Sequence, residues 1–91
     1  SEADFLQMVV GLARLKGWIV FFTWNSQHSP AGEPDLRLIR PPRVLFCELK
    51  SEKGKATKEQ DNALALLALC PGVESYLWRP HHWQQIVDVL S

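Results

Sequence analysis

Apolar positions recur along the chain with two different periods, and the changes of period delimit its elements. Residues 2–16 are predicted to form a helix, because apolar side chains recur there at helical spacing and Gly17 offers a C-cap. The recurring positions are Phe5, Met8, Val9, Leu12 and Leu15. This stripe is therefore expected to pack against the rest of the fold.

Runs of β-branched and aromatic residues predict strands over 18–24, 35–39, 44–50 and 73–78, the first of them buried. Further helices are predicted over 57–69 and from Pro80 onward, and residues 25–32 are predicted to form a flexible loop. The order α-β-β-β-α-β-α, without repeats or a linker, indicates one α/β domain spanning residues 1–91.

The segment Arg40-Pro41-Pro42-Arg43 joins two of these strands and determines how they pair. Proline cannot donate ladder hydrogen bonds, so the chain is expected to reverse there, in a widened loop or with a cis bond before Pro42. A turn centred on the Pro41–Pro42 bond places Arg40 opposite Arg43 and Asp35 opposite Glu48.

Asp35, Glu48 and Lys50 then point to the same side of the sheet, because opposed residues share a face and side chains alternate along a strand. A one-residue slip in register would separate them. The other face is predicted to be core, since it collects only apolar residues: Leu36, Leu38, Leu45, Cys47 and Leu49.

Two carboxylates and an amine arranged in this way can hold a divalent cation beside a scissile phosphodiester. Opposed acids destabilise a sheet unless a cation lies between them or one carboxyl is protonated. Taken singly, Asp35 is also typical of a turn, and Glu48 with Lys50 is typical of an exposed ion pair. Together they favour a metal site with Asp35 and Glu48 as ligands and Lys50 beside the reacting water.

Positive charge is concentrated in residues 37–58, although the formal net charge of the chain is zero. Seven of the ten Lys and Arg residues lie in this span, with only two acids, Glu48 and Glu52. Such a stripe can bind nucleic-acid phosphates, but the same composition suits a solvated loop. The predicted DNA contacts are Arg37, Arg40, Arg43, Lys53, Lys55 and Lys58.

Cys47 and Cys70 lie in apolar contexts and are predicted to be buried free thiols, which fits a reducing cytoplasm. No apolar run approaches the roughly 20 residues of a membrane span, and no signal peptide is visible. The three histidines, His28, His81 and His82, are interpreted as surface or interface residues.

Glu2 and Gln60 each have a structural and a catalytic interpretation. An acid such as Glu2 in a first helical turn is favoured by the helix dipole, yet it also lies near the apolar stripe that meets the sheet. Thr57-Lys58-Glu59-Gln60 fits a capping box, in which the Gln60 side chain reaches back to the cap.

An ordered set of motifs resembles the PD-(D/E)xK nuclease superfamily: Gly32-x-Pro34-Asp35, Glu48-x-Lys50, a Lys/Gly-rich loop and Thr57-x-x-Gln60. The chain looks most like the virus-type replication-repair nuclease (VRR-NUC) group in its short stand-alone phage form. The similarity extends from Glu2-Ala3-x-Phe5 through Gly17-Trp18 to Tyr76-x-Trp78-Arg79-Pro80. One position departs, because Glu33 stands where relatives often carry an apolar or aromatic residue.

The resemblance implies a restriction-endonuclease-like core with a mixed sheet flanked by helices. The catalytic residues that it implies are Glu2, Asp35, Glu48, Lys50 and Gln60. Its implied cofactor is Mg²⁺ or Mn²⁺, with the ligands Asp35, Glu48, Glu2 and the carbonyl of Leu49. It further implies a homodimeric endonuclease for branched DNA, such as Holliday junctions or flaps, in the cytoplasm of a phage-infected or bacterial cell.

Two alternatives come from other functional classes. A non-catalytic DNA-binding or assembly module with the same fold would bind DNA through residues 37–58 and need no metal. A purely structural dimerisation domain would not bind DNA at all.

Overall fold

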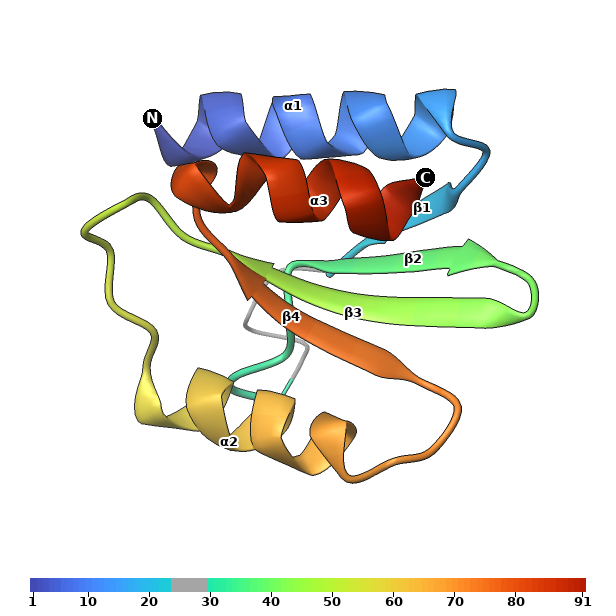
Figure 1. The fold of residues 1–91 in the computed structure, drawn as a ribbon. Helices are drawn as coiled ribbons and strands as arrows, with labels where there is room; N and C mark the ends of the chain where they lie inside the picture. The colour runs from blue at the N-terminus through green and yellow to red at the C-terminus, as the bar shows by residue number, and fades with distance from the viewer. Residues whose placement is uncertain (24–29) are drawn as a thin grey trace.

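A four-stranded sheet lies between two helices on one face and one helix on the other (Figure 1). The computed structural model describes residues 1–23 and 30–91. Its elements are α1 (Glu2–Leu15), β1 (Ile19–Phe22), β2 (Leu36–Arg40), β3 (Arg43–Leu49), α2 (Lys58–Ala68), β4 (Glu74–Trp78), the 3-10 helix η1 (Pro80–His82) and α3 (Trp83–Leu90). The fold is therefore α/β in the predicted order of helices and strands, except that η1 is added before α3.

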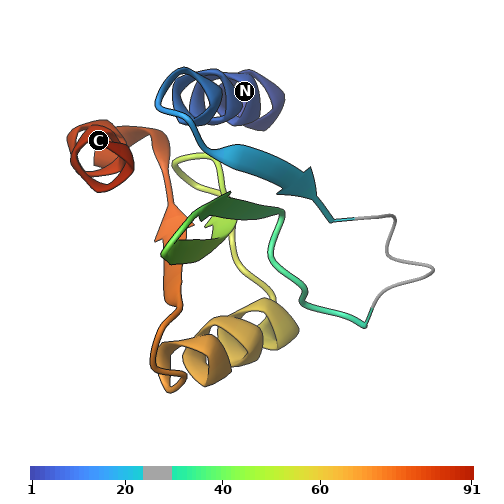
Figure 2. The same ribbon diagram turned by 90° about the vertical axis from the view of Figure 1, so that its right-hand side faces the viewer.

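The sheet is mixed, with the strand order β1-β2-β3-β4. The pairs β1–β2 and β2–β3 are antiparallel, whereas β3 and β4 are parallel and are connected through α2 on the far face (Figure 2). Arg40 pairs with Arg43 and Leu36 with Cys47, which is the predicted hairpin register. The Pro41–Pro42 bond is cis, one of the two predicted solutions.

The core lies between the sheet and the two helices α1 and α3. The predicted core face of the hairpin is confirmed, because its five apolar residues are all buried: Leu36, Leu38, Leu45, Cys47 and Leu49. Ile86 and Leu90 of α3 and Trp78 of β4 complete this layer. Trp18 is also buried, and its indole N–H donates a 2.9 Å hydrogen bond to the carbonyl of Leu90.

The predicted stripe of α1 is wrong in part. Met8 and Leu15 are exposed, whereas Val10 and Ala13 are buried together with the predicted Phe5 and Val9. Residues 5, 9 and 13 are spaced by four, so the helix is rotated about its axis relative to the stripe through positions 8, 12 and 15.

β1 was expected to be buried, and this expectation is also wrong. Ile19 is 60% exposed and Phe22 is 49% exposed, because β1 is an edge strand whose only partner in the described chain is β2. An apolar run does not distinguish an edge strand from a central one.

Helix α2 covers the second face of the sheet loosely, since none of its residues is buried. Cys70, predicted to be buried, is exposed: it follows the C-terminal end of α2, and its thiol contacts only the carbonyl of Leu66, at 3.5 Å, among the described residues. Cys47 is buried, as predicted.

Residues 25–29 of the predicted loop, including His28, lie outside the described residues. Trp24, the last residue of the first predicted strand, lies outside them as well. Within residues 1–23 and 30–91, no helix is both long and apolar enough to cross a membrane.

Candidate functional site

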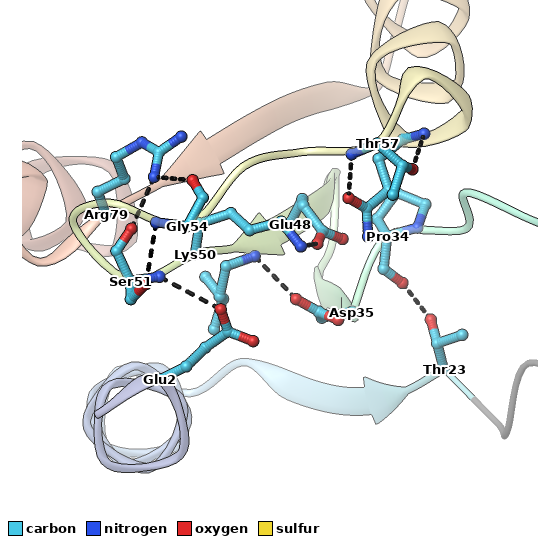
Figure 3. A network of polar contacts seen from close by, with 12 residues as sticks. Glu2, Thr23, Pro34, Asp35, Glu48, Lys50, Ser51, Gly54, Thr57 and Arg79 are labelled. Carbon is cyan, nitrogen blue, oxygen red and sulfur yellow. Dashed lines mark hydrogen bonds and ion pairs between the residues drawn. The ribbon is translucent and has the colours of Figure 1, made fainter.

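The ends of β1 and β3 and the start of α1 surround a cavity of about 340 Å³. Its walls carry two acids and an apolar lining: Glu2, Ala3, Leu6, Phe22, Thr23, Asp35 and Leu49. Glu48 and Lys50, which flank Leu49 on β3, lie next to Asp35 (Figure 3). The structure thus gathers Glu2, Asp35, Glu48, Leu49 and Lys50 from three separate segments of the chain.

Asp35 is held in place by both of its neighbouring strands. Its Oδ2 accepts a 2.8 Å hydrogen bond from the backbone N–H of Leu49, and its carbonyl accepts one of 2.9 Å from the N–H of Thr23. The Thr23 hydroxyl donates to the carbonyl of Pro34 (Figure 3). The Asp35 carboxylate is therefore fixed at the sheet end with its position set by the backbone.

Among the described residues, Glu48 is the one charged residue that is buried, with only 1% of its surface exposed. The Lys50 ammonium lies 2.9 Å from its Oε2, so the ion pair that was one interpretation of this strand is present, although Glu48 is buried and Lys50 is half-buried. The other carboxylate oxygen of Glu48, Oε1, has no hydrogen-bond partner among the described residues. A carboxylate in this condition is costly in an apolar interior.

The two carboxyl groups resist being charged together. Burial raises the pKa of Asp35, and the hydrogen bond from Leu49 offsets only part of that rise. Burial also raises the pKa of Glu48, where Lys50 lowers it and the charge of Asp35 raises it further. For Lys50, burial alone would lower the pKa, but the contact with Glu48 outweighs it and the pKa is raised. The single positive charge of Lys50 thus compensates the charges of Asp35 and Glu48 only in part.

Glu2 reaches the same cavity from the first turn of α1. Its Oε1 accepts a 3.2 Å hydrogen bond from the backbone N–H of Ser51, directly after Lys50 (Figure 3). Its charge raises the pKa of Asp35, which places it within electrostatic reach of the pair. The acid of α1 therefore stands beside the metal ligands suggested by the sequence.

Gln60 lies at the start of α2 and forms the predicted capping box. Its Oε1 accepts from the Thr57 N–H at 2.8 Å, and its own N–H donates to the Thr57 hydroxyl at 3.1 Å. The side chain does not line the Asp35 cavity. A catalytic role for Gln60 stays a prediction. Glu33 likewise lines another cavity, against α2, and not the one that holds Asp35.

The basic stripe is divided between two places. Arg40 donates to the carbonyls of Lys16, Leu90 and Ser91, and Arg43 donates to the carbonyl of Val89. Both guanidinium groups also lie over the Trp18 ring, at 4.5 and 5.1 Å from its centroid.

These two arginines therefore fasten the hairpin to the end of α3, at the opposite end of the strands from Asp35. Arg37 lies over Phe21, 5.4 Å from its ring centroid. Lys53, Lys55 and Lys58 are exposed and follow the Glu48–Lys50 motif. Their role in binding DNA, like that of the three arginines, stays a prediction.

Arg79 belongs to the network of hydrogen bonds around Ser51 and Glu2, a role that could not be predicted from its position in the sequence. Its guanidinium group donates to the carbonyls of Ser51 and Gly54 (Figure 3). A charged residue directly after an apolar strand is the only local signal, and its partners are backbone groups that no sequence pattern identifies.

The described residues contain no ready-made group of three or more His, Cys, Asp or Glu side chains arranged to hold a metal ion. The chemistry of the donors nevertheless fits a divalent cation. Carboxylate oxygens are the ligands that Mg²⁺ and Mn²⁺ prefer, and Oε1 of Glu48, which has no hydrogen-bond partner among the described residues, provides an unused acceptor next to Asp35.

Comparison of the chain with protein-family models, with curated proteins and with solved structures finds no match in any of the three. The function of the chain must therefore be inferred from the site itself.

Proposed function

We propose that this chain is a metal-dependent DNA endonuclease that hydrolyses phosphodiester bonds in branched DNA. The observation that carries the proposal is the buried Glu48 carboxylate beside Asp35: its Oε1 has no hydrogen-bond partner among the described residues, and its Oε2 faces the Lys50 ammonium. A buried anion of this kind persists at a cost that a bound cation would remove. The α/β order and the mixed sheet support a restriction-endonuclease-like core for the fold.

Asp35 and Glu48 would hold Mg²⁺ or Mn²⁺, with Glu2 and the carbonyl oxygen of Leu49 as further ligands. The bound ion would supply an activated water and positive charge at the scissile phosphate. Lys50 would donate a hydrogen bond to the oxygen on which negative charge develops, because its ammonium already lies beside Glu48. The Leu49 N–H keeps the Asp35 carboxylate oriented throughout.

Exposed lysines would bind the DNA on either side of the cleaved bond. Lys53 and Lys55 lie on the loop after β3, and Lys58 begins α2. Contacts of this type bind phosphates and carry no sequence information, so the substrate would be selected by its shape. Junctions and flaps are the expected substrates.

Cleavage assays test the proposal. Purified protein with Mn²⁺ is expected to cut a flap or a four-way junction in a panel that also includes splayed-arm and duplex DNA. Asp35→Asn and Glu48→Gln, which preserve side-chain shape, are expected to reduce cleavage by about 100-fold or more. Glu59→Gln, an exposed acid of the first turn of α2, is the matched control and should cleave like the wild type. A wild type that cuts no DNA with either metal would refute the proposal.

The second candidate is a non-catalytic DNA-binding module, favoured by the ion pair of Lys50 with Glu48, which supplies one positive charge without a metal. Calorimetric titration with Mn²⁺ separates the two functions. Binding heat that disappears in Asp35→Ala supports the nuclease, whereas retardation of DNA without any metal binding supports the module. Failure to retard any DNA at low salt would favour a structural dimerisation domain.

The nuclease would act as a homodimer in the cytoplasm. Two sites related by a two-fold axis would suit the two symmetric strands of a junction. The exposed apolar side chains of β1 support association between copies.

A further inference from the structure

One arginine binds the turn that follows β3. Arg79 stands directly after β4, the parallel neighbour of β3, and its Nη1 donates to the carbonyls of Ser51 at 2.6 Å and Gly54 at 2.5 Å. A longer contact, 3.4 Å, reaches the carbonyl of Glu52. Three carbonyls of a single turn thus converge on one guanidinium nitrogen, which fixes residues 51–54 against the end of β4.

The turn over residues 51–54 is in direct contact with the candidate site. The Ser51 N–H donates to Glu2 Oε1, and the Gly54 N–H donates to the Ser51 hydroxyl at 3.1 Å. A Cβ on Gly54 would lie 2.8 Å from the Ser51 hydroxyl oxygen and 3.8 Å from Glu2 Oε1. The turn is therefore closed tightly behind the Glu2 carboxylate.

The residues after Arg79 hold the same turn from a second side. The Arg79 N–H donates to His82 Nδ1 at 2.9 Å, which fixes the start of η1. His81 Nδ1 lies 2.5 Å from Glu52 Oε1. The short segment 79–82 thus contacts the turn through two side chains, since Arg79 binds the backbone carbonyls of the turn and His81 lies against Glu52. Figure 3 shows Arg79, Ser51, Gly54 and Glu2 as one continuous chain of contacts.

We infer that Arg79 is a positioning residue, which holds the turn so that the Ser51 N–H orients the Glu2 carboxylate toward the cavity shared with Asp35. This role rests on the proposed nuclease function, because Glu2 matters to the reaction only as a group beside the metal ligands. Arg79 would touch neither the substrate nor the ion and would act entirely through Ser51 and Glu2. The hydrogen bonds of Arg79 to this turn also determine where Lys53, a residue of the turn, projects.

The first test uses metal-free protein and does not depend on catalysis. In Arg79→Gln, amide hydrogen exchange at Ser51 and Gly54 is expected to accelerate about 10-fold or more, while core amides such as that of Leu45 keep their protection. Arg14→Gln, an exposed arginine of α1, is the matched control and should leave the turn unchanged. Unchanged exchange at Ser51 in Arg79→Gln would overturn the inference.

The second test asks whether Arg79 acts on the reaction through Glu2. The Mn²⁺ concentration for half-maximal cleavage is expected to rise about 10-fold in Arg79→Gln, as for other residues that orient a metal ligand, and less in Arg79→Lys. In a Glu2→Gln background, Arg79→Gln should cause no further change. If the wild type is active, two outcomes would refute the positioning role alone. Arg79→Gln could have the same effect in the wild-type and Glu2→Gln backgrounds, or it could have no effect on cleavage. A wild type without activity would refute the nuclease, and the positioning role with it.

Discussion

Glu48 carries its carboxylate at a position where the fold leaves almost no access to water. Its partner Lys50 contributes one charge, while Asp35 adds a second acid nearby. Native structures seldom leave a buried polar atom without a partner, and exceptions commonly mark a functional site. The site is therefore expected to be more stable with a cation than without one.

Metal-dependent stability follows from this arrangement. Without metal, Glu48→Gln keeps the side-chain shape but leaves the Lys50 ammonium without its partner, so its free energy of unfolding should fall by about 3 kcal/mol. Mn²⁺ at 100 times its Kd should stabilise the wild type by about 2.7 kcal/mol and leave Glu48→Gln unchanged. Urea unfolding at pH 7 with and without Mn²⁺ measures both, with the exposed Glu59→Gln as the control. Equal stabilisation of wild type and Glu48→Gln would contradict a metal site at Glu48.

Gly32 fixes the approach of the chain to Asp35. Its φ is +93°, and a Cβ would lie only 2.3 Å from the carbonyl oxygen of Glu59 in the first turn of α2. Gly32→Ala should therefore lower the free energy of unfolding by about 2–4 kcal/mol, through left-handed strain together with steric overlap.

Gly11 provides the opposite case for the same urea titration. It is an exposed residue of α1, where a Cβ would meet nothing within 4 Å. Gly11→Ala should raise the free energy of unfolding by about 0.5–1 kcal/mol. A Gly32→Ala protein as stable as the wild type would show that the close packing of Gly32 on α2 does not constrain the site.

At the residue scale, the sequence predicted which residues pair across the hairpin better than it predicted which side chains are buried. The hairpin register followed from the two prolines, because a turn centre determines every pair on antiparallel strands. That Glu48 would be buried did not follow, since its burial depends on β4, which pairs with β3 from far along the chain. The contacts of Arg79 with backbone carbonyls could not be predicted either, because they too join segments that lie far apart along the chain.

At the element scale, the start of β3 is tied to the start of β4 by a network of charged hydrogen bonds. Arg43 donates two hydrogen bonds of 2.8 Å to the Glu74 carboxylate, and the Tyr76 hydroxyl donates a third of 2.6 Å. These contacts, with Arg43 first, lower the pKa of Glu74 below its ordinary value of 4.5. Burial and the Glu74 contact raise the pKa of Tyr76 to about 12, so the phenol remains a donor at neutral pH.

The stability contributed by Glu74 should depend on pH. Because its pKa is lower in the folded state, the contribution is full above the ordinary value of 4.5 and is lost as the pH falls through the lowered value. Glu74→Gln should thus cost about 1 kcal/mol at pH 7, and this difference from wild type should shrink as the pH falls below 4.5. Urea unfolding at pH 7 and at lower pH measures it. A difference that is the same at every pH would show that shape, and not charge, is what Glu74 contributes.

The elements themselves could be predicted, but their faces could not in every case. Helix α1 carries apolar residues at positions 8–10, so more than one stripe is compatible with its sequence, and packing against β1, β3 and α3 selects the one through Val9 and Ala13. The arginines of the hairpin look like a nucleic-acid stripe in sequence. In the structure, Arg40 and Arg43 bind the last carbonyls of α3, a contact that the sequence could not predict because it depends on where a distant helix ends.

At the scale of the whole molecule, the apolar residues exceed what the described fold buries. Large exposed side chains lie on three elements or at their ends: Met8 and Leu15 on α1, Ile19, Phe21 and Phe22 on β1, Leu66 on α2 and Leu69 at its C-cap. β1 differs from the other two because it also presents an unpaired strand edge. Edge strands are usually protected by charges, prolines or bulges, and the sequence Ile-Val-Phe-Phe has no charge and no proline.

Pairing of β1 with β1 of a second copy about a two-fold axis would cover this edge, and Phe22, which lines the cavity with Asp35, would bring the two sites toward the interface. Ile19→Lys, at a position 60% exposed, is therefore expected to convert a dimer into a monomer with little change in the stability of the fold. Leu69→Lys at the C-cap of α2, at a position 80% exposed, is the matched control and should remain dimeric. Sedimentation velocity of the three proteins measures the difference. Dissociation by Leu69→Lys and not by Ile19→Lys would move the interface to α2, and a monomeric wild type would exclude the dimer.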